Sequence, residues 1–505
     1  MVSILSRING SPAQAEPGLF QGFTDIGRTG RSGSVQYEAS NDIYTIAAGG
    51  ENIWGRQDAF SFLWKKTAGD LCLTADVRLE GRGRHEHRKA GCMVRGGLGA
   101  DAPYADVVVH GDGLVSFQYR LARGGGTAEV KSALKAPVRL QLERHGDQFS
   151  VSLAKPGGPF QPVATITIRL ADPVYAGLGV CSHDSSEIES ARFSRVKLQE
   201  RGAVPDSVRR IESTLETIDI ATGERCIVHR ALEHFEAPNW SRDGQYLVFN
   251  SNGRLYRIPV SGGEPELIPT AGHGPCNNDH GFSPDGTELA MSCHLEDHGS
   301  IIYVVPAGGG KARRITEKGP SYWHGWSPDG GTLAYCARRN GEYDIYSTPA
   351  AGGAETRLTA AAGLDDGPDY SADGRHIYFN SERSGQMHIW RMRSDGSQQQ
   401  QITSDTEFAD WFPHPSPDGQ WIVFLSYSGE VQGHPADKDV VLRLMPVEGG
   451  DVRTLAILFG GQGTINVPSW SPGSDRVAFV SYLRVGPRGP VKSWRNFPAA
   501  EFGSQ

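Results

Sequence analysis

The chain has 505 residues, of which 21% are charged, and its formal net charge at pH 7 is −8. This mixed, slightly acidic balance argues against a nucleic-acid partner, and no run of about 18 apolar residues exists that would predict a membrane span. The 64 glycines and 30 prolines, together with few stretches of helical period, favour a turn-rich all-β fold.

The first 16 residues (MVSILSRINGSPAQAE) contain one arginine and only a short apolar patch. This pattern is too weak for a signal peptide. We therefore expect a periplasmic or secreted protein if a signal has been removed, and a cytoplasmic one otherwise.

Residues 1–200 predict a β-sandwich of the jelly-roll type. About ten short runs with alternating polarity, from FSFLWKK at 60–66 to ARFSRVKL at 191–198, are separated by Gly-rich turns. Trp54 and Trp64 are either stacking platforms for sugar rings or packing residues. The basic run 81–89 (GRGRHEHRK) is read as a solvated loop, with an anionic polymer as the alternative ligand.

A charged segment without periodicity, 201–213, is the expected linker to a repeat array at 214–485. Six copies of one phrase, an aromatic or small residue followed by Ser and an Asp-Gly turn, recur about every 45 residues, which predicts the blades of a β-propeller. The copies begin at Ser241, Ser283, Ser327, Ser371, Ser416 and, in degenerate form, Ser471.

The ring can be closed by counting strands. Each full repeat holds four strand-like segments, but the last copy has only two before the irregular tail at 486–505. Two unassigned segments before the first copy, STLETIDIA (213–221) and ERCIVHR (224–230), supply the missing strands. The prediction is a six-bladed propeller whose last blade is built from both ends of the array, which leaves no open sheet edge.

The repeats also indicate where a site would lie. If each Asp-Gly turn joins the first and second strands at one pole, the residues before each Ser begin the innermost strand at the opposite pole. Imidazoles and carboxylates gathered there could act as general acids and bases or bind a divalent metal such as Mn, Ca or Zn. The alternative is that each His caps a strand end. The predicted catalytic residues are His280, His324, His414, Asp366, Arg338 and Arg339, and the three histidines are also the predicted metal ligands.

Further residues at the same pole are expected to contact a substrate. They come from the starts of the inner strands and from the loops between second and third strands, including an insertion in the fifth repeat. They are Asn278, Tyr322, Asp365, Trp411, His294, Glu382, Arg383, His434 and Lys438.

The seven cysteines show no CxxC spacing. Most stand inside apolar strand-like runs, so we expect buried, reduced thiols. Cys276 is the exception, because it precedes the predicted site directly.

The repeat phrase, as in WSPDG at 326–330, resembles that of TolB-type propellers. This resemblance implies six blades and a role in binding protein partners in the periplasm. The segment before the repeats reads as a sandwich, not as the domain expected of TolB, so a role in Tol transport is not carried over. The sandwich resembles concanavalin-like domains, many of which bind glycans.

A weaker resemblance is to oligogalacturonate lyases, whose propellers carry a His-rich metal site. Their motif places two histidines, two residues apart, before a Pro-Ser turn. His414 matches the second histidine, whereas Phe412 stands at the first.

Two functions follow as hypotheses. The first is a carbohydrate-active enzyme, a lyase or glycoside hydrolase, acting at the His-rich mouth of the propeller on an oligo- or polysaccharide, for which an acidic polymer is one option. The second is a non-catalytic scaffold that binds a glycan, or a protein partner through the propeller face.

Overall fold

The computed structural model describes residues 18–81 and 85–486. Over these residues the chain is all-β, as predicted, and its single helical element is the 3₁₀ turn η1 (Asp206–Val208). No helix among them is long and apolar enough to cross a membrane. The chain divides into two compact units, one of Met1–Glu143, Val151–Phe160 and Ile168–Gly202, the other of Arg144–Ser150, Gln161–Thr167 and Ala203–Gln505.

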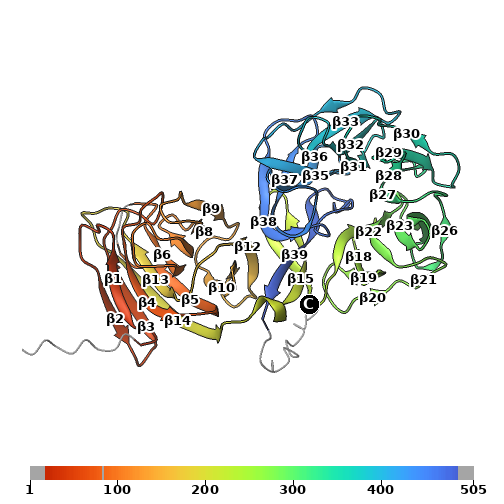
Figure 1. Cartoon of the computed structure of the whole chain (residues 1–505). Coiled ribbons are helices and arrows are strands. Elements are labelled where there is room, and N and C mark those ends of the chain that lie inside the picture. Colours follow the sequence, from red (N-terminus) through yellow and green to blue (C-terminus); the bar gives the residue numbers. More distant parts are fainter. Residues whose placement is uncertain (1–17, 82–84, 487–505) are drawn as a thin grey trace, which may run out of the picture. The chain divides into compact units, whose positions relative to one another are not determined.

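The N-terminal sandwich consists of two antiparallel seven-stranded sheets, coloured red to yellow in Figure 1. The first sheet has the order β1 (Gly22–Ile26), β4 (Phe60–Thr67), β13 (Val174–Cys181), β6 (Lys89–Arg95), β7 (Tyr104–His110), β8 (Val115–Arg120) and β9 (Ala128–Lys131). The second has the order β12 (Gln161–Thr167), β11 (Gln148–Ala154), β10 (Arg139–His145), β5 (Asp70–Leu79), β14 (Glu189–Gly202), β3 (Ile43–Ala48) and β2 (Ser34–Glu38).

Four of these strands, β1, β2, β3 and β9, were not predicted. Three of them lie at sheet edges, and β2 and β9 are only five and four residues long and contain no buried residue, so their sequence signal is weak. Trp64 is a packing residue: its ring contacts Tyr175 edge-on at 5.1 Å, and its Nε1 donates a hydrogen bond to Thr24 Oγ1 at 3.0 Å. Trp54 remains 39% exposed.

The propeller has six blades (yellow-green to blue in Figure 1), and the six-bladed prediction is confirmed. The chain enters it at β15 (Arg210–Asp219), which starts inside the segment predicted as a linker. From inside to outside, blades one to three are β17 (Glu236–Trp240), β18 (Tyr246–Ser251), β19 (Arg254–Pro259) and β20 (Glu266–Leu267); β22 (Cys276–Phe282), β23 (Glu288–Leu295), β24 (Gly299–Pro306) and β26 (Arg313–Arg314); and β27 (Ser321–Trp326), β28 (Thr332–Arg339), β29 (Glu342–Pro349) and β30 (Thr356–Arg357).

Blades four and five are β31 (Asp365–Tyr370), β32 (His376–Ser381), β33 (His388–Arg393) and β34 (Gln400–Gln401), then β35 (Phe408–Pro415), β36 (Trp421–Ser428), β37 (Ala436–Pro446) and β38 (Arg453–Gly461). A short parallel pair, β21 (Thr270–Ala271) with β25 (Gly310–Lys311), links the outer parts of the first two repeats.

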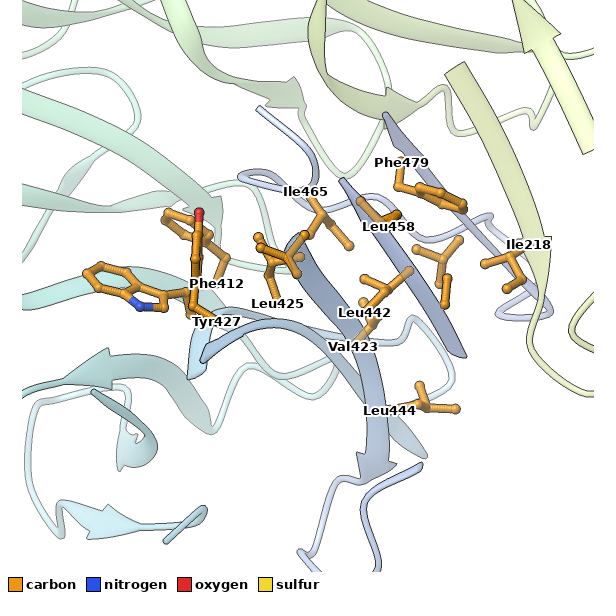
Figure 2. Packing of buried hydrophobic residues seen from close by; sticks show 14 of the residues in the cluster. Ile218, Phe412, Val423, Leu425, Tyr427, Leu442, Leu444, Leu458, Ile465 and Phe479 are labelled. Carbon is orange, nitrogen blue, oxygen red and sulfur yellow. The ribbon is translucent and has the colours of Figure 1, made fainter. Parts of the chain in front are cut away.

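The sixth blade closes the ring with strands from both ends of the array. β15 pairs with β39 (Arg476–Val485) along its full length and with β16 (Arg225–Ala231) on its other side. A bridge between Trp470 and Val477 supplies the innermost strand. Figure 2 shows the resulting core, in which Ile218 of β15 and Phe479 of β39 belong to one buried cluster with residues of the fifth blade. Burying this apolar surface holds the ring shut.

The repeated Ser-x-Asp-Gly phrase is a turn, as predicted. In the third copy, Ser327 Oγ donates to Asp329 Oδ1 at 2.6 Å and accepts from the backbone N–H of Thr332 at 2.9 Å. Gly330 takes φ +72°, which favours glycine. In the degenerate last copy Ser474 takes this position, with φ +60°.

Candidate functional site

The first residues of the innermost strands bring ionisable side chains together at one pole of the propeller channel. Each of the five complete inner strands contains a register shift, and at three of these shifts a residue has positive φ: Ala237, Gly367 and Phe412. Such bulges re-aim side chains and are common beside functional sites. The pole cluster consists of Glu236, Asp279, His324, Asp366 and His434.

An ion pair between blades three and four lies at the centre of the pole cluster. His324 Nε2 lies 3.2 Å from Asp366 Oδ1, and His324 Nδ1 lies 3.3 Å from the carbonyl oxygen of Asn466. Burial lowers the pKa of His324, but the hydrogen bond and charge of Asp366 outweigh it and raise that pKa to about 8. Burial raises the pKa of Asp366, and the contact with His324 then lowers it to about 2. The two side chains therefore form an imidazolium–carboxylate pair at neutral pH.

A second imidazole approaches the same carboxylate from the fifth-blade insertion. His434 Nε2 lies 3.8 Å from Asp366 Oδ2. Its ring packs against Trp411 and Phe412, with ring centres 4.6 Å and 5.2 Å away. Burial lowers the pKa of His434, so it is neutral at pH 7 and can accept a proton.

Two carboxyl groups of the pole cluster titrate near neutral pH. Burial raises the pKa of Asp279 to about 7, with the charge of His324 opposing and that of Asp366 adding to the effect. Burial and the neighbouring charge of Asp279 raise the pKa of Glu236 to about 7. Groups with such pKa values can donate or accept protons at physiological pH.

The three predicted catalytic histidines do not come together. Their ring nitrogens do not form a group within 4.8 Å of one another, and each ring contacts a different backbone carbonyl. His280 is fully buried, with Nε2 3.5 Å from the carbonyl oxygen of Val248, and burial lowers its pKa to about 4. His414 lies 3.1 Å from both Asp369 Oδ2 and the carbonyl oxygen of Ile465. The predicted ligand set of His280, His324 and His414 is therefore corrected: only His324 belongs to the pole cluster.

The two predicted catalytic arginines make their contacts within their own blade, the third. Arg339 forms a two-pronged ion pair with Glu355, with its closest contact at 2.8 Å. Arg338 is exposed, and its Nε donates to the carbonyl oxygen of Gly341 at 3.2 Å. Neither contact places a guanidinium in the pole cluster.

The nine residues predicted to contact a substrate fall into three groups. His434 belongs to the pole cluster, and Trp411 packs against its ring. Arg383 pairs with Asp365 at 2.7 Å, and Tyr322 packs near Tyr343. The remaining four comprise one buried side chain, Asn278, and three exposed ones, His294, Glu382 and Lys438. Sequence reasoning missed Glu236 as a candidate; its signal was its position at the start of an inner strand.

Cys276 and Cys293 form a disulfide across β22 and β23. This corrects the expectation of a reduced thiol for Cys293; Cys276 was already the exception to that expectation. Cys276 Sγ also lies 3.6 Å from His273 Nδ1. These three side chains place potential metal-binding atoms within 4.8 Å of one another. The other five cysteines are free.

A cavity of about 220 Å³ lies at the opposite end of the inner strands, where the Ser-x-Asp-Gly turns begin. All six blades line it. Its wall includes the residue before Ser in every copy: Trp240, Phe282, Trp326, Tyr370, Pro415 and Trp470. The sequence-based prediction assigned this pole to turns alone, although an aromatic residue precedes Ser in five of the six copies.

Arg242 brings a positive charge to the cavity wall. It follows Ser241, where the second, third, fifth and sixth copies have proline. Its Nε donates to the carbonyl oxygen of Ser283 at 3.2 Å, and its Nη2 to that of Phe282 at 3.3 Å. The carboxylate of Asp369 and the amide of Asn239 also line the cavity. The arrangement is an aromatic and proline-rich hollow with a few polar groups, which is typical of binding sites.

Comparison with known proteins agrees with the repeat analysis. Residues 323–456 match the family model of the TolB β-propeller domain, PD40. The uncharacterized protein Atu1656 of Agrobacterium fabrum is 52% identical over 276 residues, which are 54% of this chain and 94% of that protein. The solved structure of a candidate TolB from Agrobacterium tumefaciens shows 52% identity and a TM-score of 0.53, and covers 55% of this chain and 99% of that one. An oligogalacturonate lyase from Vibrio parahaemolyticus is more distant, with 13% identity and a TM-score of 0.35 over 55% of this chain and 98% of that one. The chain therefore belongs to the TolB-type β-propeller proteins.

Proposed function

We propose that the propeller is a non-catalytic binding platform that receives a protruding segment of a partner protein in the axial cavity. The observation that carries the proposal is the lining of this cavity. The residue before Ser is aromatic in five of the six copies, and Arg242 replaces the proline of the repeat phrase. Aromatic and arginine side chains are the residues most enriched where proteins bind one another.

The size of the cavity favours a polypeptide over a sugar polymer. At about 220 Å³ it is smaller than the roughly 300–1,000 Å³ of pockets that enclose drug-sized ligands. It has room for one or two side chains, but not for several sugar rings. Membership of the TolB-type family also favours a protein partner, because propellers of this type commonly bind proteins. A carboxylate or apolar side chain at the tip of a loop would meet Arg242 and the surrounding indoles.

A selection experiment tests this proposal. A phage-displayed library of random peptides is selected on the full chain, and the enriched peptides are measured by titration calorimetry and by tryptophan fluorescence. Arg242→Pro restores the repeat phrase without adding a residue foreign to this turn, and we expect it to weaken peptide binding at least tenfold. Arg254→Ala, on an exposed position of β19, is the matched control. The proposal fails if no peptide is enriched, or if the enriched peptides bind Arg242→Pro as well as wild type.

A second candidate function rests on the pole cluster. The His324–Asp366 pair beside Glu236 and Asp279, each with a pKa of about 7, could supply a general acid and base for a carbohydrate lyase or hydrolase. A panel of neutral and acidic oligosaccharides, assayed for unsaturated uronate and for new reducing ends, tests this function. Turnover that His324→Ala abolishes and Arg242→Pro leaves unchanged would support the enzyme.

A further inference from the structure

Four histidines gather at one end of the N-terminal sandwich, far along the chain from the propeller site. Strand register explains part of this arrangement. Cys181 of β13 pairs with Lys89 of β6, which pairs with His110 of β7. Extending the antiparallel register by two residues places His183, which follows β13, opposite His87, which precedes β6. His85 lies on the same loop as His87.

The distances between the rings confirm that the side chains meet. The ring centres of His85 and His183 are 4.0 Å apart, and those of His87 lie 5.6 Å from each of them. The ring centre of His110 is 6.1 Å from that of His87. Four imidazoles from three neighbouring strand ends therefore occupy one small volume.

Rotation of side chains would bring these rings to the separations that a shared metal ion requires. Zinc binds an imidazole nitrogen at about 2.0–2.1 Å, so a ring centre lies about 3.2 Å from the ion and two tetrahedral ligands have ring centres about 5 Å apart. The observed spacings lie on both sides of this value. The ring nitrogens of these histidines do not converge on one point in the structure. His85 and His87 are exposed, however, and can turn about their side-chain torsions.

His183 is the fixed member of the group. Its φ is +61°, an uncommon backbone conformation for a residue other than glycine, and one that marks functional positions. Its Nδ1 is buried without a hydrogen-bond partner among the described residues. Ser182, the residue before it, anchors the loop by donating through Oγ to the carbonyl oxygen of Gly50 at 3.1 Å.

Two of the four histidines, His183 and His110, have lowered pKa values. Burial, together with the charges of His85, Lys89 and His87, lowers the pKa of His183 to about 4. Burial and Lys89 lower the pKa of His110 to about 4 as well. Neutral imidazole is the ligand form, so both rings can coordinate at pH 7. His110 Nδ1 is also buried and unpartnered within the described part of the chain.

The alternative reading of this basic loop as an anion-binding surface is less favourable. The Lys89 ammonium group, which would attract an anion, is buried and already donates to Asn52 Oδ1 at 2.9 Å, to the carbonyl oxygen of Ile53 at 3.0 Å and to Gln118 Oε1 at 3.2 Å.

We propose that His85, His87 and His183, with His110 as a fourth imidazole, form a binding site for a divalent transition metal of the zinc class. An all-imidazole donor set suits Zn²⁺, Cu²⁺ and Ni²⁺ and disfavours Mg²⁺ and Ca²⁺. The site is separate from both candidate sites of the propeller.

Zinc titration of the full chain tests this site. Metal-stripped protein is titrated with ZnCl₂ under non-reducing conditions by calorimetry, and we expect one ion per chain with a Kd below about 10 µM. Loss of one ligand should weaken binding at least tenfold in His87→Gln and in His183→Asn. Asparagine is chosen at position 183 because it tolerates positive φ, so the loop is expected to stay folded.

Two control variants and a spectrum complete the test. His298→Gln changes an exposed histidine of the second blade, and His273→Gln changes the histidine beside the Cys276–Cys293 disulfide; both should bind zinc as wild type does. Co²⁺ substituted for zinc should give the visible absorption of a tetrahedral nitrogen site in wild type but not in His87→Gln. The proposal is overturned if wild type binds no zinc, if the two sandwich variants bind it normally, or if His273→Gln is the variant that loses it.

Discussion

His324 Nε2 lies 3.2 Å from Asp366 Oδ1, and this ion pair joins the third and fourth blades inside the channel. Both side chains are almost fully buried. Because the charged forms of the two groups stabilise each other, the folded state holds the proton of His324 more tightly and that of Asp366 less tightly than the unfolded chain does.

The pair predicts a defined dependence of stability on pH. The raised pKa of His324 gives stability that is complete below its ordinary value of 6.5 and is lost as pH rises through about 8; it amounts to roughly 2 kcal/mol. The lowered pKa of Asp366 gives stability that is complete above its ordinary value of 3.8 and is lost as pH falls through about 2. Urea unfolding at pH 5.5, 7 and 9 should therefore show a free energy of unfolding that falls with rising pH.

Asp279 adds to the same slope. Its pKa of about 7 is raised above the ordinary 3.8, so its protonated form stabilises the fold, and this contribution is lost as pH rises through about 7. Asp279→Asn should flatten the fall in stability between pH 5.5 and 9, whereas Asp297→Asn, on an exposed loop, should not. An unchanged slope in Asp279→Asn would contradict the assignment.

Closure of the ring depends on Phe479, which lies in the shared core of the fifth and sixth blades and is fully buried. Phe479→Ala should lower the free energy of unfolding by about 3–5 kcal/mol, because it removes buried apolar surface and leaves a cavity. Leu267→Ala, at a position 46% exposed, should change it by no more than about 0.5 kcal/mol. Denaturant titration of both variants measures the difference. A small effect of Phe479→Ala would show that the last blade does not hold the ring together.

The sequence predicts the backbone arrangement of this structure better than the positions of its side chains. The turn at Ser327, Asp329 and Gly330 is a local motif whose hydrogen bonds depend on residue type and spacing, so its repetition predicts the blades. Closure follows by counting strands, and the pairing of β15 with β39 confirms it.

The candidate site was predictable only in part. His280 and His324 occupy corresponding positions of two repeats, yet His280 lies against Val248 while His324 reaches Asp366. Bulges and side-chain torsions decide this difference, and neither can be predicted from the spacing of a repeat. The grouping of His87 with His183 was equally hidden, because it depends on the pairing of strands about a hundred residues apart.

The cysteines make a prediction that needs no partner or substrate. Cys276 and Cys293 are joined, and the remaining five thiols are free. Oxidised protein unfolded in guanidinium without a reductant should react with five equivalents of a maleimide, and with two more after reduction. Mass spectrometry counts the adducts. Labelling of all seven cysteines without reduction would show that the pair is not joined.

The backbone conformation of Gly330 makes the last prediction. Its φ is +72°, and a Cβ added there would meet nothing closer than Pro284 Cδ at 3.8 Å, so Gly330→Ala introduces backbone strain without a steric clash. We expect a loss of about 1 kcal/mol in the free energy of unfolding, and a smaller loss in Gly330→Asn, because asparagine tolerates this conformation. Gly308→Ala is the matched control: its Cβ would also meet open space, but its φ is not positive, so it should be neutral or slightly stabilising. Equal losses in Gly330→Ala and Gly308→Ala would mean that backbone conformation is not what selects glycine in the repeated turn.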